Sequence, residues 1–431
     1  MNEPTSVVIQ PAIGVQGSVR VPGDKSISHR YAMLSALAKG VTRLTNFSAA
    51  HDCFSTLNCM RALGADWKTS EAGAIEIEGR PSGLSAARQP LDCGNSGSTM
   101  RMLSGILAAQ TFITELCGDD SLSRRPMQRI ITPLTAMGAR IDSSDGGRPP
   151  LRIHGAHLKG ITYTLPVASA QVKTAMLFAG LLAEGETRVE EPLRTRDHGE
   201  LALKAFGAEI KQDGLAVSIR GGQPLQAIEA SVPGDLSSAA FFLCAAALFP
   251  GSHLIIDQVL MNPTRARLLD WLSILGLRIS VMQIEEQHGE LVGTIEVRGD
   301  QLRGGTISGS DTAALIDEIP VLAAIAPFTK DGIEVRDAKE LRVKESDRIA
   351  AMAAGLRAMG ARIEEREDGF SIPGGQQLHG AEVQSFGDHR IAMAFGVAAL
   401  RASGETKICG AEASAVSFPG FFDAMSAIAQ R

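Results

Sequence analysis

Cysteine is sparse in this chain, and the cysteines are not paired in sequence. The 431 residues contain six, at Cys53, Cys59, Cys93, Cys117, Cys244 and Cys409, and no two of them form a C-x-x-C motif. Structural zinc sites and redox-active disulfides commonly use such closely spaced pairs. We therefore expect free, buried thiols, with no disulfide and no metal site.

Long hydrophobic runs are also missing. The longest apolar stretch, Ala239 to Phe249, is much shorter than the ~20 residues that a transmembrane helix needs. The opening residues MNEPTSVVIQP lack the basic and then apolar pattern of a signal peptide. We therefore expect a cytoplasmic protein that has no membrane partner.

The chain has no excess of positive charge and no common nucleotide-binding motif. Its 42 Lys and Arg residues are outnumbered by 48 Asp and Glu residues, which gives a net charge of −6 and argues against a nucleic-acid partner. No segment matches G-x-x-x-x-G-K-[ST] or a strand-borne G-x-G-x-x-G, so neither ATP nor a dinucleotide is predicted as a cofactor. Low-complexity linkers are absent too, so a domain boundary has to be inferred from repeats.

One pattern is present about six times: a polar or charged loop, an apolar Ala-rich helix, then a Gly or charged break and a short β-type run. The loops and helices are Asp24 to Gly40, Gly94 to Gln110, Ala168 to Gly185, Asp235 to Gly251, Leu315 to Gly332 and Gly387 to Gly404. Each places its unusual residues just before an apolar helix, where unpaired backbone N–H groups and the helix dipole favour anions. The repeats therefore predict several sites for phosphate or carboxylate groups.

A second marker recurs every seventy to eighty residues. Helices are expected to end at a glycine that runs into a strand, at Gly64, Gly138, Gly207, Gly276 and Gly360. The unit is therefore predicted to be βαβαββ, in an α/β fold. The last copy ends at FFDAMSAIAQR, and we expect the N-terminal segment TSVVIQPA to supply its closing strands.

A chain of this length is large enough for two cores. Halving the repeat count puts the crossings at the turn-type dipeptides Pro22-Gly23 and Pro233-Gly234. The predicted domains are residues 23–234 for the first three repeats, and residues 1–22 plus 235–431 for the second three.

Seven cations stand near the predicted helix starts. Lys25 and Arg30 flank Ser26 in PGDKSISHR, and the others are Arg125, Arg196, Lys344, Arg348 and Arg390. Taken alone, Lys25 and Arg30 are explained equally well by a capped helix with solvated basic residues, and each of the others is more often a surface charge. Two acids accompany them, Asp317 in LIDEIP and Glu345 in VKESDR, for which an N-cap or a salt bridge is the structural alternative. Taken together, the residues indicate polyanion binding with acid–base catalysis and no metal.

These motifs carry a resemblance over essentially the whole chain. They are PGDKSISHR, GNSGSTMR, SRRPM, SAQ, LIDEIP, VKESDR and GDHR, in that order. As a set they resemble the EPSP synthases, the 3-phosphoshikimate 1-carboxyvinyltransferases of the enolpyruvyl transferase family. The resemblance implies two domains of three βαβαββ units each, of the inside-out α/β barrel kind, with the active site in the cleft between them.

The resemblance also implies a reaction and a set of site residues. The enolpyruvyl group of phosphoenolpyruvate would be transferred to the 5-hydroxyl of shikimate 3-phosphate, with release of phosphate and without a cofactor. We expect the protein to be a monomer. Asp317 would take the hydroxyl proton, and Glu345 with Lys25 would protonate the methylene carbon. The residues implied to hold shikimate 3-phosphate are Lys25, Ser26, Arg30, Ser169, Ala170, Gln171, Arg196, Asp317 and Lys344. Those implied to hold phosphoenolpyruvate are Lys25, Asn95, Gly97, Arg125, Gln171, Arg348 and Arg390.

Two positions depart from the family pattern. Ala170 stands where many members have a second Ser, so one hydroxyl contact is lost, while Arg196 resembles an arginine that other members place against shikimate 3-phosphate. Val416 stands where some members carry a Lys before Ser417-Phe418-Pro419. One contact to phosphoenolpyruvate is therefore missing from the expected set.

Two alternatives remain at this point. UDP-N-acetylglucosamine enolpyruvyl transferases share the fold and the donor, but they usually have Lys-Asn in the first loop and a reactive Cys shortly before Arg-Pro; here Lys25-Ser26 stands in the loop, and Cys117 is expected to be a buried core thiol. A catalytically silent repeat scaffold is the other alternative, and it leaves the clustered cations unexplained. His29, His198 and His389 are expected to form structural hydrogen bonds.

Overall fold

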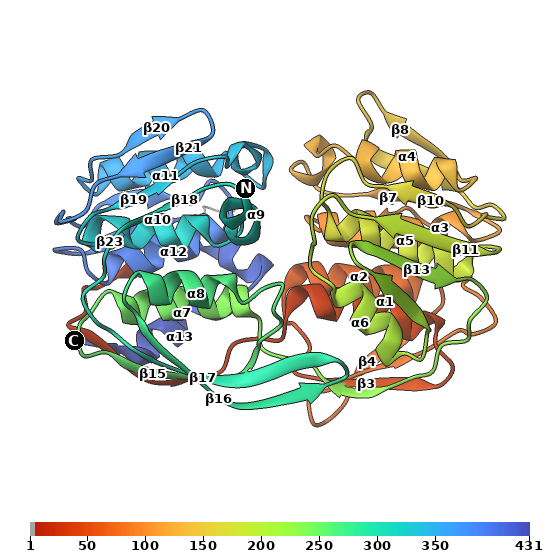
Figure 1. Ribbon diagram of the computed structural model, residues 1–431, viewed down its shortest axis with the longest axis horizontal. Helices are drawn as coiled ribbons and strands as arrows, with labels where there is room; N and C mark the ends of the chain where they lie inside the picture. Colours follow the sequence, from red (N-terminus) through yellow and green to blue (C-terminus); the bar gives the residue numbers. More distant parts are fainter. Residues whose placement is uncertain (1–4) are drawn as a thin grey trace. The chain divides into compact units, whose positions relative to one another are not determined.

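The computed structural model describes residues 5–431 (Figure 1), so residues 1–4 of the predicted second domain lie outside the described residues. The chain divides into two compact units. Unit 1 comprises residues 5–22, Pro233–Glu285 and Leu291–Arg431, and unit 2 comprises Gly23–Val232 and Glu286–Glu290. The chain therefore passes between the units four times.

Within residues 5–431 each unit contains three sheets. In unit 2 they are β14 (Glu229–Ser231), β3 (Val41–Thr45), β5 (Ile75–Glu78) and β4 (Trp67–Thr69); β6 (Leu91–Asp92), β7 (Ile113–Cys117), β9 (Arg148–His154) and β8 (Arg140–Ser144); and β10 (Thr162–Thr164), β11 (Glu186–Glu190), β13 (Ala216–Arg220) and β12 (Ile210–Asp213). In each sheet the first two strands are parallel and the other pairs are antiparallel. This is the strand order that a βαβαββ unit produces.

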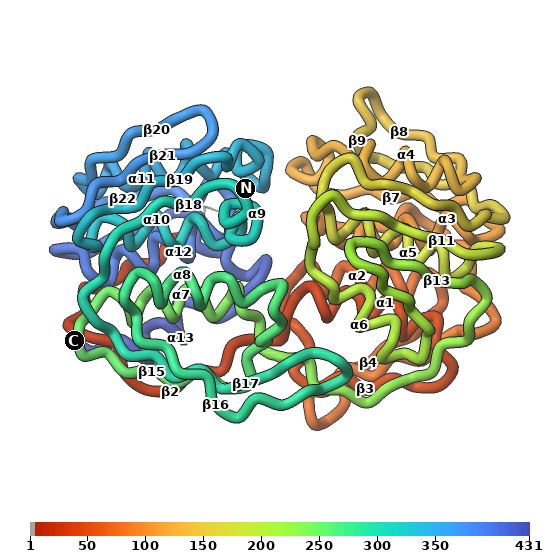
Figure 2. Tube along the Cα trace, in the orientation of Figure 1, coloured from red at the N-terminus to blue at the C-terminus, as the bar shows by residue number. Residues whose placement is uncertain are grey.

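The unit 1 sheets follow the same plan with additions. They are β16 (Arg278–Gln287), β17 (Glu290–Arg298), β15 (His253–Leu260), β2 (Gly14–Val19) and β24 (Ala429–Gln430); β18 (Gly305–Ile307), β19 (Ile333–Val335), β21 (Gly369–Ile372) and β20 (Glu364–Arg366); and β1 (Ser6–Ile9), β23 (Thr406–Cys409) and β22 (Glu382–Gln384). Strand β1 pairs antiparallel with β23, which confirms that the segment TSVVIQPA completes the sheet of the last repeat. Figure 2 shows β2 alongside β15, with which it pairs in parallel.

The helices of unit 2 are α1 (Lys25–Leu37), α2 (His51–Ala62), α3 (Gly97–Ala108), α4 (Gln128–Ala136), α5 (Ala170–Leu182) and α6 (His198–Ala205), with the 3₁₀ turn η1 (Leu122–Arg124). Those of unit 1 are α7 (Leu236–Ala247), α8 (Arg267–Ile274), α9 (Ser310–Leu315), α10 (Ile319–Ile325), α11 (Arg348–Ala358), α12 (His389–Ala399) and α13 (Phe421–Ile428), with η2 (Ala326–Phe328), η3 (Lys339–Val343) and η4 (Ala411–Val416). The six apolar helices predicted from the repeats are α1, α3, α5, α7, α10 and α12.

The apolar helices form the core. In unit 1, α7, α10 and α12 pack against one another, and every residue of α7 is buried. A helix that is apolar on all sides is stable only where it is surrounded, and the three sheets surround these helices. In unit 2, α3 and α5 pack closely against each other, β9 lies against α3, and β11 lies against α5. Each unit is thus an α/β fold with helices inside and sheets outside.

The glycine marker is confirmed at all five positions. Gly64, Gly138, Gly207, Gly276 and Gly360 have φ values between +87° and +110°, the region that glycine enters without a Cβ penalty. Each of these glycines directly follows the end of a helix, where a C-terminal cap needs a residue with positive φ. Separately, no helix within residues 5–431 combines the length and apolarity needed to cross a membrane.

Candidate active site

The first loop places three predicted residues around the start of α1. Asp24 caps the helix by accepting the Ile27 N–H at 2.8 Å, which fixes the backbone of the residues that follow. Lys25 Nζ lies 2.9 Å from Asp52 Oδ2. Arg30 donates to the Ser26 carbonyl oxygen at 2.8 Å, one turn back on the same helix. Lys25, Ser26 and Arg30 are therefore neighbours at one helix N-terminus.

Arg30 is a buried cation. Its side chain also donates to Thr174 Oγ1 of α5 at 3.0 Å, and only 3% of the residue is exposed. Desolvation lowers the pKa of the guanidinium from 12.5 to about 10, although Glu200 and Asp24 act to raise it and Arg196 acts to lower it further. A buried charge in this condition gains from a nearby anion. Arg196 lies close enough to influence it, half-buried in the segment before α6.

The small-residue loop before α3 holds Arg125. Asn95 Oδ1 accepts from Arg125 Nη2 at 2.8 Å, while Asn95 Nδ2 donates to Asp119 Oδ2 at 2.7 Å. Gly97 opens α3 beside this arginine: a Cβ there would lie 3.4 Å from Arg125 Nη1 and 3.1 Å from Arg101 Nη1. The absence of a side chain at Gly97 thus lets two guanidinium groups approach the loop.

Gln171 is clamped from α3. Arg101 Nη1 donates to Gln171 Oε1 at 2.8 Å, and Gln171 Nε2 donates to Ser98 Oγ at 2.9 Å. Both ends of the amide are therefore fixed. Ser169, the N-cap of α5, accepts the Val172 N–H, and Ala170 is the first helical residue, so both predicted residues lie half-buried at the same helix start as Gln171.

In unit 1 the central group is Arg348, the first residue of α11. Its Nε lies 2.8 Å from Asp388 Oδ2, its Nη2 lies 2.7 Å from Glu345 Oε2, and its Nη1 lies 3.7 Å from Asp317 Oδ1. Only 1% of Arg348 is exposed. Burial acts to lower the pKa of this guanidinium, but Glu345 and Asp388 raise it overall. The arginine is permanently charged and draws both predicted catalytic carboxylates to itself.

Lys344 and Arg390 complete this group. Lys344 Nζ lies 3.8 Å from Asp317 Oδ1 and 3.3 Å from Glu340 Oε1. Arg390, near the start of α12, donates to the Asp317 carbonyl oxygen at 2.7 Å. Asp317 is thus contacted through its side chain and its backbone, and about a fifth of its side chain is exposed.

The structure gathers the predicted residues into two groups. The unit 2 group is Lys25, Ser26, Arg30, Asn95, Gly97, Arg125, Ser169, Ala170, Gln171 and Arg196, and the unit 1 group is Asp317, Lys344, Glu345, Arg348 and Arg390. Each group is built on helix N-termini and carries several cations, an arrangement that suits phosphate and carboxylate ligands. Val416 lies in η4 and adds no charge.

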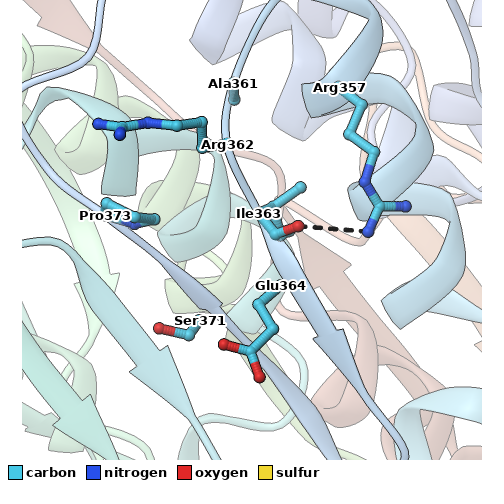
Figure 3. A pocket seen from close by; sticks show the side chains of 7 residues that line it. All are labelled: Arg357, Ala361, Arg362, Ile363, Glu364, Ser371 and Pro373. Carbon is cyan, nitrogen blue, oxygen red and sulfur yellow. Dashed lines mark hydrogen bonds between the residues drawn. The ribbon is translucent and has the colours of Figure 1, made fainter.

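A separate open hollow lies at the other end of α11 (Figure 3). Arg357, Arg362 and Glu364 are among its lining residues, and Arg357 Nη2 donates to the Ile363 carbonyl oxygen at 3.2 Å. Arg348 starts the helix and Arg357 lies in its last turn, so the hollow is about 13 Å away at 1.5 Å per residue. It contains none of the predicted site residues.

The expectation of a buried Cys117 is wrong. Cys117 is half-exposed, because it is the last residue of β7, where the chain leaves the sheet. Desolvation and the nearby Asp92 nevertheless raise the pKa of its thiol, which disfavours the reactive thiolate. Cys53, Cys59, Cys93 and Cys244 are buried as expected, and Cys409 is half-exposed.

The histidines form hydrogen bonds as expected at two positions. His29 Nδ1 lies 2.7 Å from Thr56 Oγ1, and His198 Nδ1 lies 2.6 Å from Glu290 Oε1. His389 Nδ1 lies 4.0 Å from Asp388 Oδ1, and the hydrogen bond expected of His389 stays a prediction. Across the described range 5–431, no three His, Cys, Asp or Glu residues are grouped as metal ligands would be.

Sequence reasoning missed residues that hold the predicted ones. Arg101 ends the GNSGSTMR motif, so its position next to the loop was a usable signal. Asp388, fully buried, binds Arg348 and also caps α12 by accepting the Arg390 N–H at 2.9 Å. The GDHR motif contains it, but only the fold shows that one carboxylate orders two arginines.

Comparison with known proteins gives consistent matches. The family model for EPSP synthase (3-phosphoshikimate 1-carboxyvinyltransferase) matches residues 9–425. The chain is 60% identical to a 3-phosphoshikimate 1-carboxyvinyltransferase of Koribacter versatilis, over 99% of this chain and 100% of that protein. It is 54% identical to one from Solibacter usitatus, over 98% and 99%. A solved EPSP synthase from Acinetobacter baumannii has a TM-score of 0.88 and 42% identity, covering 98% of both chains.

Proposed function

Because this chain belongs to the EPSP synthase family, we propose that its two groups of site residues bind one pair of substrates, phosphoenolpyruvate and shikimate 3-phosphate. The chain is a transferase, a 3-phosphoshikimate 1-carboxyvinyltransferase. It transfers the enolpyruvyl group to the 5-hydroxyl of shikimate 3-phosphate and releases phosphate, a step of the shikimate pathway to chorismate and the aromatic amino acids.

The charges of the substrates account for the number of cations. Two phosphates and two carboxylates enter the same site, and their mutual repulsion has to be offset by fixed positive groups. For shikimate 3-phosphate we assign Lys25, Ser26, Arg30, Ser169, Ala170, Gln171, Arg196, Asp317 and Lys344. For phosphoenolpyruvate we assign Lys25, Asn95, Gly97, Arg125, Gln171, Arg348 and Arg390. Arginine suits the planar phosphate and carboxylate contacts, and lysine supplies a point charge.

The acids carry the proton transfers in this proposal. Asp317 accepts the proton of the 5-hydroxyl while the hydroxyl oxygen attacks C2 of phosphoenolpyruvate. Glu345, with Lys25, protonates the methylene carbon C3. These steps give a tetrahedral intermediate. Loss of a C3 proton and of phosphate from C2 then restores the double bond. The observation that carries this assignment is Arg348, which lies 2.7 Å from Glu345 and 3.7 Å from Asp317 and so places both acids around one anion-binding cation.

The test is phosphate release by the purified chain with phosphoenolpyruvate and a choice of acceptor. Release is expected with shikimate 3-phosphate and not with UDP-N-acetylglucosamine. Release only with the nucleotide sugar would contradict the assigned acceptor, and release with neither would contradict the assigned activity. Asp317→Asn and Glu345→Gln should each lose turnover while still binding shikimate 3-phosphate, which isothermal titration measures.

We further propose that the chain acts as a cytoplasmic monomer with domains at residues 23–234 and at residues 1–22 plus 235–431. The repeat count supports this division. Light scattering during size-exclusion chromatography tests the monomer, since a mass of about twice 45.5 kDa would contradict it. Limited proteolysis tests the boundaries, because early cleavage is expected in exposed connections between domains.

A further inference from the structure

A buried ionic cluster in unit 2 takes no part in the chemistry assigned above. Lys173 Nζ on α5 lies 2.8 Å from Glu191 Oε2 and 2.7 Å from Glu200 Oε1. The three side chains are between 1% and 4% exposed. One ammonium group therefore serves two carboxylates in the interior, and Glu200 Oε2 has no hydrogen-bond partner in the described structure.

The two carboxylates stand at the two ends of one loop. Glu191 directly follows β11 and Glu200 lies in the first turn of α6, so the six residues 192–197 between β11 and α6 connect them. Arg196 belongs to this loop. The hydroxyl of Thr195, its neighbour, donates to Glu191 Oε1. Lys173 thus fixes both ends of the loop, and Glu191 also fixes its middle.

The same turn of α5 also holds the other phosphate-binding arginine. Thr174 follows Lys173 and accepts from Arg30 Nη2 at 3.0 Å. Gly199, beside Glu200, lets α6 approach this point, since a Cβ there would lie 2.6 Å from Thr174 Oγ1. Helix α5 therefore sets the position of Arg30 through Thr174 and that of the Arg196 loop through Lys173.

The rest of the loop has little packing of its own. Pro192, Leu193 and Arg194 are exposed, whereas Glu191, His198 and Glu200 are buried. A buried ion cluster contributes little to stability compared with apolar packing of the same volume. Ordering an otherwise exposed loop that carries a binding arginine is therefore the better explanation of the cluster than support of α5 itself.

We propose that Lys173, Glu191 and Glu200 are positioning residues for the binding of shikimate 3-phosphate. They hold the loop that carries Arg196 against the start of α5, where Ser169 and Gln171 lie. This inference rests on the proposed binding of shikimate 3-phosphate by Arg30 and Arg196. It assigns the cluster to one of the two substrates, because the loop carries Arg196 and the next residue of α5, Thr174, holds Arg30, whereas Arg125 is held by Asn95 and Ser121.

The test is Glu191→Gln, which removes one buried carboxylate and leaves Lys173 paired with Glu200. We expect the KM and Kd for shikimate 3-phosphate to rise about tenfold, as a small displacement of a binding group can cause. The KM for phosphoenolpyruvate and kcat at saturation should stay within about twofold of wild type, because the loop orders only one substrate. Glu190→Gln is the matched control: it alters the neighbouring residue, whose surface pair with Arg188 lies outside the cluster, and should change neither constant.

Each result decides the inference. An unchanged affinity for shikimate 3-phosphate in Glu191→Gln, or equal losses for both substrates, would overturn it. If Glu191→Gln does not fold, Thr195→Val removes only the hydroxyl contact and should raise the same KM about threefold; no rise would overturn the inference. A wild-type chain that does not bind shikimate 3-phosphate would overturn the proposed function as well, whereas an active wild type with an unaffected Glu191→Gln overturns the positioning role alone.

Discussion

Replacing Gly97 by Ala should weaken phosphoenolpyruvate binding without disturbing the fold. Gly97 is the first residue of α3, and its φ is outside the left-handed region, so Ala is allowed there. The added Cβ would lie 3.1 Å from Arg101 Nη1 and 3.4 Å from Arg125 Nη1. The first distance is closer than ordinary van der Waals contact, so the end of the Arg101 side chain has to move by a few tenths of an ångström.

That movement acts on two residues to which phosphoenolpyruvate binding is assigned, Gln171 and Arg125. Arg101 holds the Gln171 amide at 2.8 Å, and the methyl group also occupies space beside Arg125. We take the combined loss as one weakened hydrogen bond to a charged group, about 1.5 kcal/mol, which corresponds to roughly a tenfold rise in the KM for phosphoenolpyruvate. The free energy of unfolding should change by less than about 1 kcal/mol, since Ala is the better helix residue.

Steady-state phosphate release, with each substrate varied in turn, measures the effect. The KM for shikimate 3-phosphate is the internal comparison and should rise much less, because Gln171 is the one residue assigned to this substrate that the methyl group disturbs, whereas Ser26, Arg30 and Arg196 lie elsewhere. Equal increases in both KM values, or a large loss of thermal stability, would show that the methyl group disrupts α3 generally. An unchanged KM for phosphoenolpyruvate would refute the placement of the ligand beside Gly97.

Three further predictions follow from the site. Asp317→Asn should lower kcat by about 10²–10⁴-fold with little change in either KM, as expected for loss of a general base, which phosphate release will show. Arg125→Lys should raise the KM for phosphoenolpyruvate about tenfold, because lysine cannot make the bidentate contact, and it should leave the affinity for shikimate 3-phosphate unchanged by titration calorimetry. Asp388→Asn keeps a helix-capping side chain but removes the charge facing Arg348, so urea unfolding at pH 7 should show a loss of about 3 kcal/mol. Burial opposes ionisation of Asp388, but Arg348 and His389 hold its pKa below the ordinary 3.8; this contribution is therefore complete above about pH 4 and is lost as pH falls through the lower folded pKa, so the deficit should shrink only below pH 4.

Local signals predicted the elements well. The apolar helices, the helix-ending glycines Gly64 and Gly360 and the strand β1 could all be predicted, because each depends on residues close in sequence or on a repeat that appears several times. Helix N-termini could be located for the same reason. Lys25, Arg348 and Arg390 were identifiable because unusual residues preceded apolar runs.

Ion pairs and hydrogen bonds between residues far apart in the sequence could not be predicted. Lys173 lies in a helix whose other residues, apart from Gln171 and Thr174, are apolar or glycine, and its partner carboxylates follow 18 and 27 residues later. Glu290 begins β17 just after a polar turn, and only the fold shows that it meets His198 in unit 2. The repeat pattern shows where a helix starts. Which distant side chain a residue pairs with depends on how one repeat packs against another, and the pattern does not show that.

The division of the sequence between the units dictates an order of assembly during synthesis. Strand β2 emerges early, yet it pairs with β15, whose first residue, His253, is 234 residues after Val19. At about 5–20 residues per second, ribosomes need roughly 10–50 s to cover that distance. Gly23–Val232 can meanwhile fold apart from the segment Glu286–Glu290. Until β15 has been synthesised, the backbone of strand β2 cannot form this pairing. The sequence of β2 is GVQGSV, and its two glycines and two polar side chains disfavour aggregation in that interval.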